Sequence, residues 1–171
     1  MRVLGIDPGI ATCGYAVVDR PPAPGREPVL AACGALRPEG TGPLRLAALF
    51  DGIRGLIRAH APDATAVERL YHNRNVRTAT EVGQARGVIL LALVQAGLPV
   101  TEYTPTEVKL AVTGFGGADK AQMRRVVAAR LRLLRPPRPD DAADAVGLCL
   151  CHFQGEAMRR LVAASVRAAG T

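Results

Sequence analysis

The amino-acid sequence predicts an α/β protein built on a mixed five-stranded sheet with helices on both faces. Three strand-like segments with turn-rich connections follow one another near the N-terminus, which is typical of an antiparallel meander. Two further strand-like segments alternate with helical patterns, which is typical of parallel crossover units. Three antiparallel strands extended by two parallel crossover strands therefore form one mixed sheet.

Short apolar runs bounded by turn residues define the strands. The proline-rich segment 20–28 is a strong turn signal, and it separates the second run from the third. The first and fourth runs each end in an acidic residue. The strands are expected at residues 3–6, 14–19, 29–36, 64–68 and 100–103.

Helical spacing of apolar residues and terminal signals define the helices. One helix begins at Pro43, and a long helix is expected at residues 78–96. The next helix follows Thr104, which is the expected N-terminal cap. Further helices are expected at residues 119–134 and after Asp140, which is expected to cap the last helix of the core.

The length of 171 residues suits one domain, expected to span residues 1–153, followed by a peripheral helical tail at residues 154–171. The longest uninterrupted apolar run, residues 88–94, is far shorter than a membrane span. The N-terminus lacks the pattern of a signal peptide. A soluble, cytoplasmic protein with no membrane partner is therefore expected.

The chain is basic, with a net charge of +7 and a pI of about 9.9. This charge favours an anionic partner, and nucleic acid is the usual one. Arginine dominates the basic residues, as expected where phosphates are bound by paired hydrogen bonds. Charge alone fits a soluble basic domain as well, and a GC-rich genome would also enrich arginine.

Four carboxylates occupy the ends of predicted elements. Asp7 ends the first strand, Glu68 ends the fourth, and Asp141 and Asp144 open the last helix on one shared face. Because these element ends can meet, the four side chains are expected to converge. Oxygen ligands of this kind suit Mg²⁺ or Mn²⁺, and four converging acids would repel one another without a cation.

Each carboxylate also has a structural interpretation. Asp7 precedes Pro-Gly, where fixing a turn is its alternative role, whereas Asp141 and Asp144 suit the positive end of a helix dipole. Asp140 fits that structural role better, as the cap. Glu68 is harder to explain structurally, because an acid that continues an apolar strand is not buried unpaired.

Several ordered motifs resemble the RuvC-type Holliday junction endonucleases. An Asp-x-Gly after a strand is shared with sugar kinases and actin-like ATPases, but the sequence shows no second phosphate loop and no P-loop. The ordered set is far more specific and extends from residue 5 to about residue 152. It comprises Gly5-Ile6-Asp7-Pro8-Gly9 with Gly14 and Tyr15, Glu68-Arg69-Leu70-Tyr71 with Asn73, Gly83-Gln84-Ala85-Arg86-Gly87, the stretch from Glu102-Tyr103 to Val108-Lys109, and Asp140-Asp141-Ala142-Ala143-Asp144-Ala145.

The resemblance implies a ribonuclease H-like nuclease domain that resolves Holliday junctions during recombination and repair. It implies metal-dependent hydrolysis that nicks two strands of like polarity, with Mg²⁺ or Mn²⁺ and two ions per active site. Asp7, on the central strand, is expected to contact both ions, and Glu68 and the Asp141/Asp144 pair to complete one shell each. Lys109 and Lys120 match family lysines near the scissile phosphate, where their charge would offset that of the phosphate, and an ordinary solvated surface lysine is the alternative for each.

The resemblance also implies partners. Tyr71 is expected to stack on a base at the junction crossover, and a core tyrosine is the less favoured alternative because its neighbours are polar. Asn73, Arg74 and Arg77 are the other expected DNA contacts. The apolar helix at residues 78–96 suits the interface of a homodimer or burial beneath another helix of the same chain. The RuvA–RuvB branch-migration machinery is expected as a partner, and a junction-binding protein without cleavage is the alternative function.

Overall fold

The computed structural model describes residues 1–21, 26–69 and 76–169. The predicted alternation of strands and helices appears in the expected order. The elements along the chain are β1 (Arg2–Asp7), β2 (Cys13–Asp19), β3 (Val29–Leu36), α1 (Pro43–His60), β4 (Ala64–Glu68), α2 (Val76–Gln95), β5 (Val100–Tyr103), α3 (Pro105–Thr113), α4 (Lys120–Arg130) and α5 (Asp140–Ala169).

The strands form one five-stranded sheet in the order β3-β2-β1-β4-β5. β2 pairs antiparallel with both β1 and β3, whereas β4 runs parallel to β1 and β5 runs parallel to β4. This topology confirms the predicted fold class, with three antiparallel strands extended by two parallel crossover strands. β1 is therefore the central strand, and the C-terminal ends of β1 and β4 lie side by side.

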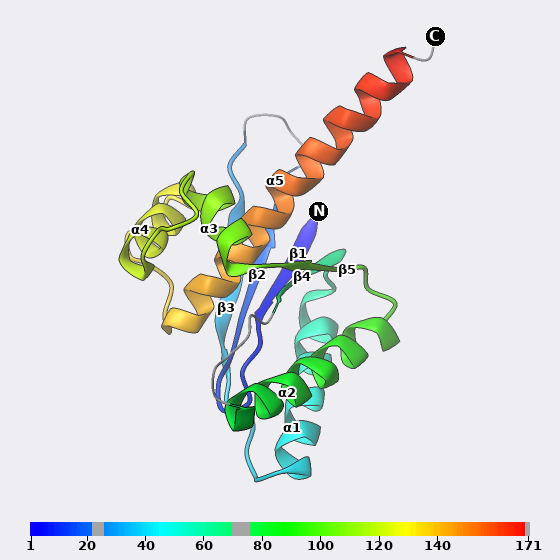
Figure 1. Cartoon of the computed structure of the whole chain (residues 1–171), viewed down its shortest axis with the longest axis vertical. Coiled ribbons are helices and arrows are strands. Elements are labelled where there is room, and N and C mark those ends of the chain that lie inside the picture. The colour runs from blue at the N-terminus through cyan, green and yellow to red at the C-terminus, as the bar shows by residue number, and fades with distance from the viewer. Residues whose placement is uncertain (22–25, 70–75, 170–171) are drawn as a thin grey trace.

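Helices cover both faces of the sheet (Figure 1). One core cluster joins α1 and α2 to the sheet, and its buried residues include Leu49, Ile53, Ile89 and Leu93. The second cluster joins α3, α4 and α5 to the opposite face. Within the described part of the chain, no helix is long and apolar enough to cross a membrane.

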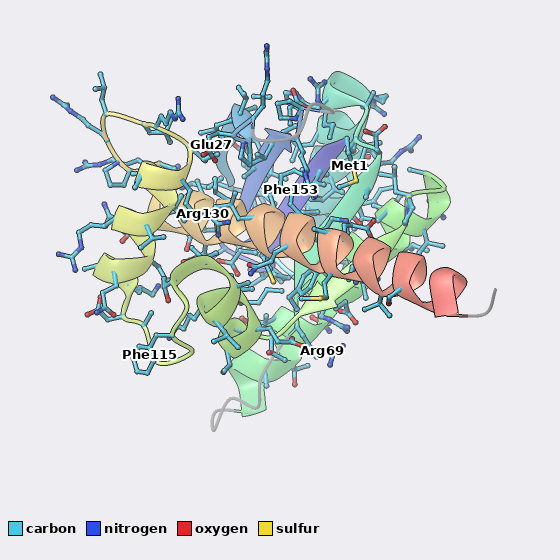
Figure 2. The ribbon with its side chains drawn as sticks, turned by 90° about the horizontal axis from the view of Figure 1, so that it is seen from above. Met1, Glu27, Arg69, Phe115, Arg130 and Phe153 are labelled. Carbon is cyan, nitrogen blue, oxygen red and sulfur yellow. The ribbon has the colours of Figure 1, made fainter. Side chains whose placement is uncertain are left out.

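Two strand glycines allow α5 to lie directly against the sheet, which it crosses in Figure 2. A Cβ atom at Gly5 would lie 2.2 Å from the backbone oxygen of Ala145, and one at Gly14 would lie 2.3 Å from that of Asp141. Real Cβ atoms do not approach an oxygen this closely, so any side chain at these positions would push α5 away. The glycines of the two strand motifs thus set the distance between the helix and the strands.

The structure corrects two predicted helix ends. The helix predicted at residues 119–134 ends at Arg130, because Leu131 turns inward to the core and Arg132 adopts a left-handed conformation with φ of 52°. Asp140 is not a cap, since it is the first residue of α5. Its carboxylate instead pairs with Arg124 of α4 at 2.8 Å.

The predicted boundary between domain and tail, after residue 153, falls within one continuous helix. α5 extends without interruption from Asp140 to Ala169. Its first half is buried against the sheet, and the helix then projects beyond the rest of the molecule (Figure 1).

Substitution of Gly5 by alanine is expected to destabilise the fold by at least about 1–3 kcal/mol, because the added methyl group meets the α5 backbone rather than a flexible side chain. The midpoint of urea unfolding is the measurement. Gly55→Ala is the matched control, because a Cβ there meets no atom within 4 Å and the residue lies inside α1. That control should leave stability unchanged or raise it slightly. Equal midpoints for the two variants would contradict the close approach of α5.

Candidate active site

One cavity of about 300 Å³ gathers all six residues that the sequence predicts to be catalytic. Its lining combines acidic groups from the sheet and from α5 with two lysines from α3 and α4, and apolar side chains complete its wall. The lining residues are Asp7, Glu68, Pro105, Val108, Lys109, Lys120, Met123, Asp141 and Asp144.

The topology explains why the acids meet. Asp7 and Glu68 are the last residues of the adjacent parallel strands β1 and β4, so both lie at the same edge of the sheet. Asp141 and Asp144 lie in the first turns of α5, whose backbone rests on Gly14 next to the end of β1. The side chains thus reach one place from three segments that are far apart in the sequence.

Burial and the charges of neighbouring acids raise the pKa values of Asp7, Glu68 and Asp144. Burial, and then the charge of Glu68, raise the pKa of Asp7 to about 8. Asp7 and Glu68 share a side-chain hydrogen bond, in which protonated Asp7 donates to Glu68. Burial also raises the pKa values of Glu68 and Asp144, and the nearby charge of Lys120 opposes that rise.

Two capped helices hold the lysines at the cavity. Lys109 lies on α3, whose N-terminus is fixed by a capping box between Thr104 and Glu107. Lys120 is the first residue of α4, directly after its cap Asp119. The ammonium group of Lys120 lies 3.8 Å from a carboxylate oxygen of Asp144. The lysine side chain is largely exposed, so this pair is screened by solvent and leaves the lysine free to contact a substrate.

The donor set fits a hard divalent cation. Four carboxylates within one partly buried cavity supply oxygen ligands, as Mg²⁺ and Mn²⁺ require, and a cation would offset the repulsion that raises the pKa of Asp7. Among the residues that the structure describes, no three histidine, cysteine or acidic side chains already converge as ligands of one ion. The carboxylates therefore share a cavity without forming a single preformed coordination shell.

The predicted DNA contacts are not tested by the structure. Tyr71, Asn73 and Arg74 lie outside the described residues. Arg77 lies in the first turn of α2, and its side chain is also outside the described part of the chain. Their roles remain predictions.

Sequence reasoning missed the apolar wall of the cavity. Pro105 and Val108 belong to α3, and Met123 belongs to α4. The sequence did contain one indication of these wall residues, which is their closeness to the two lysines. Val108 directly precedes Lys109, and Met123 follows Lys120 by three residues. Nothing in the sequence indicated that these two helices would pack against each other.

Comparisons with known proteins agree with this geometry. The model of the crossover junction endodeoxyribonuclease RuvC family matches residues 3–152. The chain belongs to this family. It is 51% identical over 171 residues to the crossover junction endodeoxyribonuclease RuvC of Salinispora arenicola, covering 98% of this chain and 97% of the relative.

Two solved structures of a RuvC protein share the fold. The Thermus thermophilus RuvC structure matches with a TM-score of 0.84 and 32% identity, covering 92% of this chain and 96% of that chain. The structure of Thermus thermophilus RuvC in complex with Holliday junction substrate matches with a TM-score of 0.82 and 30% identity, with the same coverage. The family suggested by the sequence motifs is thereby confirmed.

Asp7→Asn is expected to stabilise the fold at neutral and alkaline pH in the presence of a chelator. The folded-state pKa of about 8 exceeds the ordinary value of 3.8, so above about pH 4 the unfolded chain ionises Asp7 while the folded chain still keeps it protonated, and the free energy of unfolding falls as the pH rises toward 8. The gain should reach at least about 1 kcal/mol between about pH 7 and pH 9 and should vanish below about pH 4. Thermal unfolding across this pH range is the measurement.

The exposed aspartate Asp51 on α1 provides the control. Asp51→Asn should change the melting temperature little at any pH. If Asp7→Asn and the unchanged chain have the same melting temperature at every pH, the folded structure does not raise the pKa of Asp7.

Proposed function

We propose that this chain resolves Holliday junctions by metal-dependent hydrolysis of DNA phosphodiesters, nicking two strands of like polarity. The observation that carries the proposal is the convergence of four carboxylates and two lysines in one cavity. Membership of the RuvC family supports the same substrate, and a RuvC protein has been solved with a Holliday junction.

Each polar group in the cavity has a proposed role. Bound Mg²⁺ or Mn²⁺, two ions per site, would activate a water molecule and stabilise the leaving 3′-oxygen. Asp7 would contact both ions, because it ends the central strand and the charges of Glu68, Asp144 and Asp141 all act on it. Glu68 would complete one ligand set, and Asp141 with Asp144 the other.

The lysines would act on the substrate rather than on the metal. Lys109 and Lys120 place positive charge beside a strongly acidic cavity, where a phosphate would otherwise be repelled. Positive groups at this place also offset the charge that develops on the phosphate during attack by water. A junction-binding protein without cleavage is disfavoured, because such a protein would not need all four acids.

Paired nicking requires two equivalent sites, and one chain provides one carboxylate cavity in its described part. We propose a two-fold homodimer formed through α2. Leu91 and Val94 of α2 are 52% and 65% exposed in the single chain, while Ile89 and Leu93 are fully buried on the opposite side. The apolar second half of α2 therefore has one face on the core and another face that is not covered within the described chain.

Glycines continue the exposed face of α2. Gly83 and Gly87 precede Leu91 at intervals of four residues, and a Cβ at either glycine would meet no atom within 4 Å. Small residues allow a second helix to approach closely. The family resemblance also suggests the RuvA–RuvB branch-migration machinery as a partner and the cytoplasm as the location.

Asp7→Asn is expected to abolish cleavage of a synthetic four-way junction while leaving its binding intact, because binding is carried by basic residues elsewhere. Cleavage by the unchanged chain should require Mg²⁺ or Mn²⁺ and should stop in a chelator. Product mapping on denaturing gels and binding measured in a chelator are the assays. Asp140→Asn is the matched control, because Asp140 lies next to the site in sequence but does not line the cavity. A variant of Asp7 that cuts at the normal rate, or full cleavage in a chelator, would exclude the mechanism.

Leu91→Glu is expected to weaken both dimerisation and paired nicking, because a carboxylate buried without a partner costs several kcal/mol or is forced to take up a proton. The mass of the protein in solution and the fraction of junctions cut on both strands are the measurements. Leu44→Glu, at an exposed leucine of α1, is the control and should change neither. A strictly monomeric chain that still yields symmetric, ligatable duplexes would contradict the dimer.

A further inference from the structure

Phe115 is an exposed aromatic residue on the loop that joins the two lysine-bearing helices. Its side chain is 62% exposed, and Figure 2 shows it at the outer end of the loop between α3 and α4. The chain contains three phenylalanines, and the other two, Phe50 and Phe153, pack with the core clusters. Isolated exposed apolar side chains are common, so exposure alone does not indicate a function.

The loop that carries Phe115 is held in one conformation by hydrogen bonds. The backbone N–H of Phe115 donates to the hydroxyl of Thr113 at 3.2 Å, and that hydroxyl lies 2.8 Å from the carbonyl oxygen of Lys109. The carbonyl oxygen of Phe115 accepts from the N–H of Ala118 at 3.1 Å. Gly114 adopts the left-handed conformation that ends α3, with φ of 79°. The ring is thus displayed from an ordered loop.

Two glycines set the position of the ring. A Cβ at Gly117 would lie 2.7 Å from the ring of Phe115, so the ring rests over this glycine. A Cβ at Gly116 would lie 3.0 Å from the side-chain methyl of Thr106, so the loop folds back beside the first turn of α3. Pro105, which precedes Thr106, lines the carboxylate cavity. The loop therefore lies beside the wall of the cavity, between Lys109 and Lys120.

We propose that Phe115 stacks on an unpaired or distorted base of the DNA strand whose phosphate enters the carboxylate cavity. The proposal rests on the proposed nuclease function and adds a second aromatic contact, on the α3–α4 side of the cavity. A base offers a π face whatever its identity, so the contact would bind the strand without selecting a sequence. An ordered loop stabilises this contact further, because little conformational freedom is lost when DNA binds.

The flanking lysines favour DNA over a protein partner. Lys109 and Lys120 lie six and five residues from Phe115, and both reach the cavity proposed for the scissile phosphate. An aromatic ring on the loop that joins two lysine-bearing helices, with both lysines at a proposed phosphate site, has the composition of a surface that binds single-stranded nucleic acid. A protein partner remains a distinct outcome of the test.

The test compares substitutions of Phe115 by alanine, leucine and tyrosine. Junction affinity is measured in a chelator, and the rate of cleavage is measured with Mg²⁺ under single-turnover conditions. Phe115→Ala should weaken junction binding by about 5- to 150-fold, the range for loss of one stacked base. Phe115→Tyr should retain most of the affinity, whereas Phe115→Leu should lose most of it. Leu110→Ala, at an exposed leucine of α3 outside the loop, is the matched control and should bind normally.

A second variant displaces the ring without removing it. Gly117→Ala places a methyl group where the ring now rests, so it should weaken junction binding even though Phe115 is present. Gly55→Ala is its control, because a Cβ there meets nothing within 4 Å. Circular dichroism and melting temperatures identify any variant that fails to fold, and the tyrosine variant then decides whether the ring itself is required.

The outcomes separate the stacking proposal from the proposed function. Normal binding by Phe115→Ala, or full rescue by leucine, would overturn stacking while leaving cleavage by the unchanged chain intact. If Phe115→Ala binds junctions normally but no longer associates with itself or with another protein, Phe115 belongs to a protein interface, and the proposal is also overturned. A chain that binds junctions through Phe115 but never cuts them would instead refute the nuclease function alone.

Discussion

The direct contact between α5 and the two central antiparallel strands is the constraint on which the site depends. Gly5 and Gly14 leave no room for a side chain between the sheet and the helix backbone, so the first turns of α5 lie against the end of β1. Asp141 and Asp144 are then brought to Asp7 by backbone packing, without any direct attraction between the acids. This matters because the acids repel one another, and only the surrounding fold can hold them in a common cavity.

Much of this arrangement was predictable from local sequence, because the strands are short apolar runs whose last residues are acidic. Asp7 and Glu68 could be placed at one sheet edge once β1 and β4 were recognised as parallel neighbours. The end of α4 at Arg130 was not predictable, since Leu131 continues the apolar pattern and no glycine or proline marks the left-handed turn at Arg132. The same holds for Met123, whose place in the cavity wall depends on how α3 and α4 pack.

The exposed apolar residues proposed for the dimer and those proposed for DNA binding lie on different sides of the sheet. Leu91 and Val94 lie on α2, which packs with α1 on one face of the sheet, whereas Phe115 belongs to the helices of the opposite face. A protein interface and a substrate contact can therefore coexist without competing for the same surface. Lys109 and Lys120 accompany only the second group, which gives the two surfaces different chemistry.

The long helix α5 joins the site to the far end of the molecule. Only its first half is buried against the sheet, although the helix itself continues to Ala169. The hydroxyl of Tyr103 on β5 lies 3.1 Å from Nδ1 of the buried His152, and Arg20 donates to the carbonyl oxygen of Phe153 at 3.0 Å. These two contacts hold the helix at adjacent residues, His152 and Phe153, while its close approach to Gly5 and Gly14 holds it nearer its start. Beyond Phe153 the apolar side chains of Met158 and Val162 are exposed. Because α5 is held at two separated places, a tilt or slide of its first turns would also disturb the contacts of His152 and Phe153 about a dozen residues away, and the fold thus opposes displacement of Asp141 and Asp144 from the acids of the sheet.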